Sequence, residues 1–402
     1  MSESTDAAPS SFPPETHSPS AEFAQVPQSI FLPEDHEPGA PALNVESAPI
    51  AGSRNGPGFF ESLLWMVGFH IVQVAAVIFA CVLLVFSFLT SAGGGPSAES
   101  DLMGSVNSLM SYLGPHLIHV FGFAQLSTVL YSMLAVRLRL GRTGLRELGW
   151  RLPWKGHVIL IVALCVPLSF LCTALQSALF DVFPASRHEL EDMLRLFGQA
   201  PLSLLILIVG LGPGLGEELL FRGLIGRGLI RRWGLPAGVL CTSVLFGLWH
   251  LIPSQPLAVI PLGLAMHFVY CVTRSFWAPV VLHFLNNSLA MVILKYSQHP
   301  LVERIGNASE WHPGGNVPLL VASAATVAAI LILLWQTRVL YLRPDGTVWD
   351  QGFLITAAPP PEVSVVAVHQ QPQLLMLAGS AFNSLGFAAG LWRLTDWAGL
   401  PW

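Results

Sequence analysis

The sequence predicts an all-α fold, a polytopic transmembrane helical bundle of about eight spans behind a disordered N-terminal tail. Of the 402 residues, 53% are hydrophobic and only 11% are charged, whereas soluble domains contain about 25% charged residues. The mean hydropathy is +0.60, and long apolar runs follow one another from Leu63 onward. These observations argue against a soluble globular enzyme.

Residues 1–57 are expected to form the disordered tail. Pro, Ser, Ala and Glu dominate this segment and no hydrophobic period runs through it, so it cannot bury enough apolar surface to offset the entropy of ordering. It lacks the basic start and short apolar core of a secretory signal. We therefore expect no cleavage.

Eight apolar runs are long enough to cross a hydrocarbon core of about 30 Å as helices of roughly 20 residues. In lipid, only helices or a closed barrel satisfy the backbone, and these runs lack the alternation of barrel strands. We therefore expect helical spans at residues 63–90, 112–136, 157–182, 201–230, 235–252, 255–273, 278–296 and 317–339.

The basic residues between these runs predict the topology. If the N-terminus is cytoplasmic, the inner connections contain twelve Lys and Arg residues and the outer connections contain four. Because Lys and Arg concentrate in cytoplasmic loops, we expect eight spans with both termini in the cytoplasm.

Behind the tail we divide the chain into four parts. These are the first transmembrane helices (58–136), a core (137–300), a segment with the last transmembrane helix (301–342) and a C-terminal extension (343–402). Within the extension, the stretch PPPEVSVVAVHQQP favours a short strand and residues 373–392 favour an apolar helix. That helix is expected to lie on the membrane, dock on the bundle or span it.

Two adjacent glutamates and an arginine lie within the fourth run, where ionisable side chains cost a few kcal/mol and are usually kept for function. Glu218 and Arg222 share one helical face at the spacing of a neutralising pair, and we expect this pair to be mainly structural. Glu217 points about 100° away and lacks that partner, which suits a group that takes up and returns a proton. Pro213 and its neighbouring glycines predict that the helix restarts near Leu215.

Two further polar clusters follow, Phe246-Gly247-Leu248-Trp249-His250 in the fifth run and His283-Phe284-Leu285-Asn286-Asn287 in the seventh. Imidazole can act as a base, a hydrogen-bond donor or a metal ligand, and an Asn amide can donate to an oxyanion. Together with a glutamate base, these groups supply what amide hydrolysis requires. Each also has a structural alternative, because His250 can be a packing residue and His283 with Asn287 can bond two helices together.

Other kinds of site are not expected. No basic tract is present to neutralise phosphate, so nucleic acid is not a partner. The five cysteines lie in apolar runs without the paired spacing of a zinc or disulfide framework. The glycines at 210, 212, 214 and 216 give the spacing that allows close helix packing.

Three motifs in this order resemble the CAAX protease and bacteriocin-processing (CPBP, Abi) family of intramembrane proteases, which includes the Rce1-type prenyl-protein endopeptidases: Glu217-Glu218-x-x-x-Arg222, Phe246-x-x-x-His250 and His283-x-x-x-Asn287. The resemblance covers residues 137–300. It implies hydrolysis of a peptide bond in a membrane-associated protein, with a CAAX or prenylated protein as one alternative substrate.

The resemblance also implies roles for the motif residues. Glu217 would activate a water that His250 orients, and His283 with Asn287 would stabilise the oxyanion. Supporting roles fall to Glu218, Arg222 and Phe246.

A metal-free mechanism and a zinc mechanism both fit this residue set. Zn2+ would bind Glu217, His250 and His283, with water in the fourth position. Simple spans separate His250 and His283 in depth by more than about 10 Å, which predicts a tilted, broken or re-entrant helix.

Two alternative functions stay open beside the endopeptidase. One is a non-catalytic membrane protein of the same fold, acting in immunity or as a scaffold. The other is a proton-coupled transporter, which is disfavoured because we find no internal repeat and only one broken helix. The predicted location is a bacterial inner (plasma) membrane, and the predicted partners are the lipid bilayer and a membrane-associated protein or peptide substrate.

Overall fold

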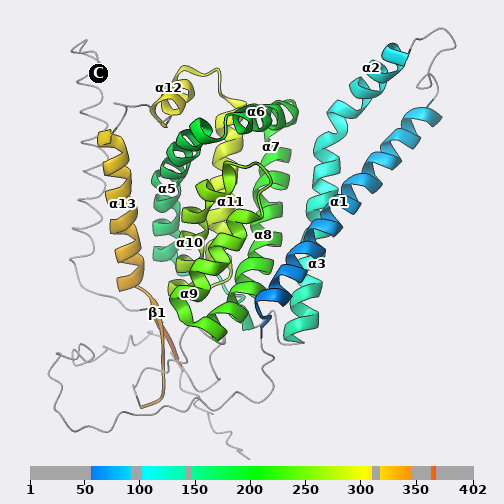
Figure 1. Ribbon diagram of the computed structural model, residues 1–402. Coiled ribbons are helices and arrows are strands. Elements are labelled where there is room, and N and C mark those ends of the chain that lie inside the picture. The colour runs from blue at the N-terminus through cyan, green and yellow to red at the C-terminus, as the bar shows by residue number, and fades with distance from the viewer. Residues whose placement is uncertain (1–55, 92–101, 142–146, 310–316, 346–363, 368–402) are drawn as a thin grey trace, which may run out of the picture. The chain divides into compact units, whose positions relative to one another are not determined.

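The computed structural model describes residues 56–91, 102–141, 147–309, 317–345 and 364–367. Seven helices in these ranges are long and apolar enough to cross a membrane, and neighbouring helices pack along one another (Figure 1). The predicted polytopic transmembrane helical bundle is confirmed. The predicted disordered tail, apart from its last two residues, and the predicted helix at 373–392 lie outside the described residues.

The described elements follow one another in this order: α1 Phe59–Thr90, α2 Leu102–Leu113, η2 Gly114–His116, α3 Leu117–Leu140, α5 Lys155–Val182, α6 Ala185–Gly198, α7 Leu202–Leu205, η3 Ile206–Leu211, α8 Gly212–Glu218, η4 Leu219–Gly226, α9 Arg227–Leu248, α10 Gln255–Thr273, α11 Trp277–Lys295, α12 Pro300–Ser309, α13 Val317–Gln336, β1 Val339–Leu342 and β2 Ser364–Ala367.

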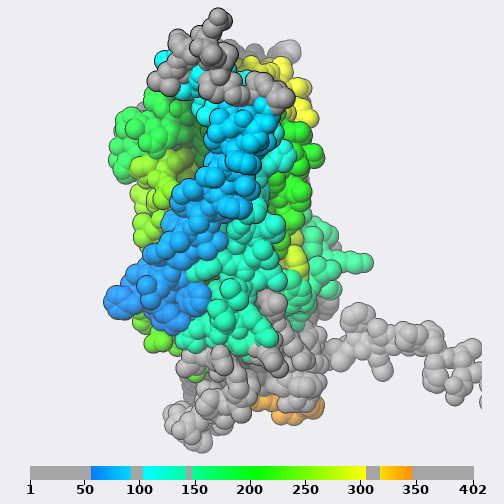
Figure 2. All heavy atoms as spheres, turned by 90° about the vertical axis from the view of Figure 1, so that its right-hand side faces the viewer, coloured from blue at the N-terminus to red at the C-terminus, as the bar shows by residue number. Residues whose placement is uncertain are grey.

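Helix α1 lies at the edge of the bundle and packs mainly on α3. Figure 2 shows α1 crossing obliquely over α3. Many of its large apolar side chains point outward, among them Leu64, Ile71 and Phe86, which are 71%, 62% and 65% exposed. An apolar face this long suits contact with lipid tails rather than water.

The sequence predicted two spans, 201–230 and 235–252, where the structure has one helical run from Leu202 to Leu248. This run bends sharply at Gly234, whose φ of 78° and ψ of 171° lie outside the helical region and favour glycine. Phe221 packs edge-on against Phe246 across the bend, with 5.3 Å between ring centroids. The run is therefore a helical hairpin with two antiparallel arms, which explains why eight predicted spans become seven candidate helices.

The short second arm of this hairpin brings His250 back into the bundle. The arm covers residues 235–248, fewer than the roughly 20 that a full crossing needs. Phe246 near its end contacts the rings of both His250 and His283, with centroid separations of 5.3 Å and 5.9 Å. The separation in membrane depth that simple spans predicted for His250 and His283 is thus absent, because the helix after Gly234 ends part-way through the bundle.

The predicted strand in the C-terminal extension is confirmed as β2. It pairs antiparallel with β1, in a register that places Tyr341 opposite Val365. The sequence predicted that the last span ends at residue 339. In the structure α13 ends at Gln336, and residue 339 is the first residue of β1. Tyr341 is fully buried beneath the guanidinium groups of Arg151 and Arg274, which lie 5.5 Å and 4.6 Å from its ring centroid.

Candidate active site

The paired glutamates lie on α8, between two π-helical turns, η3 and η4. The sequence predicted a helix restart near Leu215, whereas the chain stays helical through this point and the irregular turns lie before Gly212 and after Glu218. Pro213, the second residue of α8, has no N–H to donate to the preceding turn, which fits the irregular π-helical turn η3 directly before it. π-Helical turns within α-helices are frequent at functional sites.

Four glycines let α8 and η3 approach two neighbouring helices closely, as their spacing predicted. Gly210 and Gly214 face α11, while Gly212 and Gly216 face α3. A methyl group at Gly210 would lie 2.6 Å from Ser288 Oγ. This close packing places the two glutamates of α8 directly beside the polar face of α11.

Glu218 is the hub of a fully buried ion-pair network. Its Oε1 accepts hydrogen bonds from Arg222 Nη1 at 2.7 Å and from His283 Nδ1 at 2.8 Å. Arg222 Nη2 donates to the carbonyl oxygen of Gly263 at 2.9 Å. The predicted pairing of Glu218 with Arg222 is therefore present, and the same carboxylate also orients His283, which the sequence analysis did not foresee.

Glu217 faces the other side of the His283 ring. Its Oε2 lies 3.9 Å from His283 Nε2, and this oxygen has no hydrogen-bond partner among the described residues. Glu217 is 9% exposed, whereas Glu218 is 0% exposed. The two neighbouring carboxylates thus have different environments, one neutralised and enclosed, the other without a cationic hydrogen-bond partner and at the edge of solvent access.

Phe246 joins the two histidines and the arginine. Its ring lies under the Arg222 guanidinium at 4.6 Å, a cation–π distance, and both imidazoles are nearly perpendicular to it, at 78° and 89°. His250 Nδ1 donates to the Phe246 carbonyl oxygen at 3.1 Å. In a neutral imidazole this leaves Nε2 as an acceptor, available to a water or a substrate N–H.

Asn287 lies one turn beyond His283 on α11, as its spacing predicted. Its Nδ2 donates to the Val209 carbonyl oxygen at 3.1 Å. In an α-helical register this carbonyl would be paired with the N–H of residue 213, but Pro213 has none. One of the two N–H groups of Asn287 is therefore engaged by the backbone, and one stays available as a donor.

Sequence reasoning missed two side chains in contact with this site, Asn286 and Ser169. Asn286 Nδ2 donates to Asn287 Oδ1 at 3.3 Å, and Ser169 Oγ donates to Asn286 Oδ1 at 2.7 Å. Two features of the sequence could have indicated them. Asn286 is a second amide beside Asn287, and Ser169 is a hydroxyl in the apolar run of α5, and both groups are costly in lipid unless they are paired.

The structure also tests the residue set proposed for zinc. Within the described ranges, no group of three or more His, Cys, Asp or Glu side chains is arranged to hold a metal ion. Glu217, His250 and His283 thus do not form a preformed zinc site in this geometry. The metal requirement stays a prediction for experiment, and the mechanism below uses the side chains of the chain alone.

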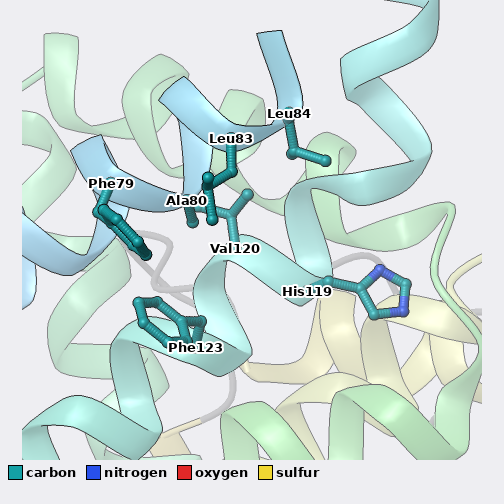
Figure 3. A pocket seen from close by; sticks show the side chains of 7 residues that line it. All are labelled: Phe79, Ala80, Leu83, Leu84, His119, Val120 and Phe123. Atoms are coloured by element: carbon teal, nitrogen blue, oxygen red, sulfur yellow. The ribbon is translucent and has the colours of Figure 1, made fainter. Parts of the chain in front are cut away.

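A pocket of about 250 Å3 lies elsewhere, between α1 and α3. Figure 3 shows its lining, in which the His119 ring points away from the apolar side chains: Phe79, Ala80, Leu83, Leu84, His119, Val120 and Phe123. None of the motif residues lines it. This pocket is apolar and has no carboxylate, so we do not assign it to the chemistry.

Comparison with known families identifies the region that contains this site. Residues 199–289 match the family described as "Type II CAAX prenyl endopeptidase Rce1-like". No curated protein and no solved structure matches the chain significantly. The resemblance predicted from the three motifs is confirmed over residues 199–289, which are similar to the Rce1-like family, and this supports a role as an intramembrane protease in an integral, multi-pass membrane protein.

Proposed function

We propose that this protein is an intramembrane endopeptidase in which Glu217 activates a water that hydrolyses a peptide bond of a membrane-associated protein. The observation that carries the proposal is the arrangement of the two carboxylates around His283. Glu218 binds Nδ1 and is neutralised by Arg222, while Glu217 faces Nε2 without a hydrogen-bond partner on its Oε2 among the described residues. One carboxylate is therefore held as a structural anion and the other is available as a base.

The first step is proton transfer from water to Glu217. The water oxygen forms a bond to the carbonyl carbon of the substrate as its proton passes to the carboxylate, and the carbonyl oxygen becomes an oxyanion. Nε2 of His250 is free to accept the second hydrogen of that water, because Nδ1 is bonded to the Phe246 carbonyl. His250 then fixes the direction of attack.

The oxyanion requires donors aimed at it. The second N–H of Asn287 is one such donor. His283 becomes another when its Nε2 also bears a proton, since Nδ1 already donates to Glu218. Glu217 has taken up the water proton at this stage, so an imidazolium in this position is balanced by Glu218 and by the oxyanion itself.

Collapse of the tetrahedral intermediate completes the reaction. The C–N bond breaks as Glu217 returns its proton to the leaving amine, which regenerates the carboxylate. The balance is one water consumed, with one new carboxyl and one new amino terminus released. No covalent enzyme intermediate is needed.

We also propose a topology with both termini in the cytoplasm, in a bacterial inner (plasma) membrane. Four tryptophans near the predicted inner connections are 43–47% exposed: Trp150, Trp154, Trp233 and Trp335. Half-exposed tryptophans are typical of a membrane–water interface. The substrate would enter from the same membrane, and a CAAX or prenylated protein stays one alternative.

The proposal is tested with purified protein and a library of membrane-tethered reporter peptides in water enriched in 18O. We expect cleavage, with one 18O atom in the new carboxyl terminus, and no cleavage by the His283→Ala variant. If folded wild-type protein cleaves no member of the library, the non-catalytic alternative is favoured and the proposal is contradicted.

A further inference from the structure

A chain of three hydrogen bonds connects α5, α11 and η3 behind the candidate oxyanion donor. Ser169 Oγ donates to Asn286 Oδ1 at 2.7 Å, and Asn286 Nδ2 donates to Asn287 Oδ1 at 3.3 Å. Asn287 Nδ2 then donates to the Val209 carbonyl oxygen at 3.1 Å. All three side chains are partly buried.

This chain fixes which way the Asn287 amide points. Its oxygen is held by a donor, Asn286, and its nitrogen is held by an acceptor, the Val209 carbonyl. A flipped amide would place oxygen against oxygen and nitrogen against nitrogen, losing both bonds. The remaining N–H of Asn287 therefore has one direction, which is what a preorganised oxyanion donor requires.

The Val209 carbonyl sets the polarity of the chain, because it can only accept a hydrogen bond. It fixes Nδ2 of Asn287, and Oδ1 of Asn287 in turn requires Nδ2 of Asn286 beside it. The Ser169 hydroxyl, which can donate or accept, bonds the remaining Oδ1 of Asn286 and anchors that side chain to α5. The position of the Asn287 amide thus depends on a hydroxyl two hydrogen bonds away, on another helix.

Burying these groups in an apolar span is costly. An amide or hydroxyl that leaves water without a partner costs at least about 1–3 kcal/mol, and apolar side chains could fill the same space between α5 and α11. Polar bonds between membrane helices are worth only about 0.6 kcal/mol on average. Helix association alone is therefore a weak reason for a Ser169–Asn286 contact.

We propose that Asn286 and Ser169 are positioning residues that act through Asn287. The inference rests on the proposed endopeptidase function, because it assigns Asn287 as a donor to the oxyanion. Neither residue touches the reacting atoms. Their contribution is to hold one N–H of Asn287 in the direction in which charge develops.

The test compares Asn286→Leu and Ser169→Ala with wild type in the reporter assay. We expect kcat to fall by about 10- to 100-fold, as for a donor displaced by about 1 Å, with KM changed less than about twofold. Ser169→Thr keeps the hydroxyl and should restore kcat. The matched control is Ser288→Ala, a buried neighbour on α11 whose Oγ has no hydrogen-bond partner among the described residues, and its kcat should equal that of wild type.

A double-mutant comparison separates positioning from general damage. In an Asn287→Ala background, Asn286→Leu and Ser169→Ala should reduce kcat no further, because the residue they act through is gone. Additive losses, wild-type kcat in both single variants, or losses that follow thermal unfolding alone would overturn the inference. These results leave the proposed function intact, whereas absence of cleavage by wild type would overturn both.

Discussion

His283 Nδ1 donates a 2.8 Å hydrogen bond to Glu218 Oε1, the same oxygen that accepts from Arg222. This bond gives two carboxylates that are neighbours in the chain different environments. Glu218 Oε1 is bound by a guanidinium and an imidazole, while Glu217 faces the opposite nitrogen of the ring at 3.9 Å.

Glu218→Gln should lower stability strongly. The substitution keeps the shape but leaves the Arg222 charge buried without its counterion, and breaking a buried pair costs about 3–5 kcal/mol. We expect a lower thermal unfolding temperature in detergent. The matched control is Glu217→Gln, which removes a buried charge that has no cationic hydrogen-bond partner and should unfold at or above the wild-type temperature. Equal destabilisation by both variants would contradict the assignment.

Gly210→Ala should disturb the contact between η3 and α11. The added methyl group would lie 2.6 Å from Ser288 Oγ and 3.2 Å from the Phe284 ring, and overpacking of this kind costs about 1–3 kcal/mol. We expect reduced stability and reduced cleavage, measured by thermal unfolding and the reporter assay. Gly198→Ala is the control, since an added methyl there meets no atom within 4 Å. The prediction is wrong if the two variants behave alike.

Phe69→Ala should weaken the contact between α1 and the end of the hairpin, next to His250. Phe69 is 1% exposed and packs edge-on against Trp249 at 4.7 Å, where His70 also stacks at 3.6 Å. Removing a buried Phe side chain costs about 3–5 kcal/mol. Leu64→Ala, on the same helix but 71% exposed, should cost less than about 1 kcal/mol. Similar unfolding temperatures for both variants would place the α1 contact elsewhere.

Cleavage should survive treatment with a zinc chelator. The proposed steps use only side chains of the chain, and the described residues contain no group of three or more metal-binding side chains arranged around one ion. The measurement is the initial rate before and after dialysis against EDTA. Loss of activity that added Zn2+ restores would instead support Glu217, His250 and His283 as ligands.

Much of the fold could be predicted because a membrane restricts it. Only helices or a closed barrel satisfy a lipid-exposed backbone, so unbroken apolar runs predicted helical spans, and costly polar groups within them pointed to Glu217, His250 and His283. The hairpin at Gly234 was less visible, because a positive φ is a property of the backbone rather than of hydropathy. Sequence therefore separated the two arms correctly but placed His250 at the wrong depth.

The parts of the site that sequence missed are side-chain directions between helices. Helical spacing showed that His283 and Asn287 share a face, but not that Glu218 lies beside Nδ1 of His283. Pro213 has no N–H to donate to the Val209 carbonyl, which is visible in the sequence, but the bond from Asn287 to that carbonyl depends on where the neighbouring helix lies. Ser169 could not be singled out, because serine is common in transmembrane helices and only its partner distinguishes it.

The most direct test of the central claim is the single-turnover cleavage rate of Glu217→Gln, measured beside the unfolding temperature of the same sample. Glutamine preserves the shape but cannot take a proton from water. We predict a rate at least about 100-fold below wild type, the scale of general-base catalysis, with no loss of thermal stability. A stable Glu217→Gln protein that cleaves at the wild-type rate would contradict the assignment of Glu217 as the base.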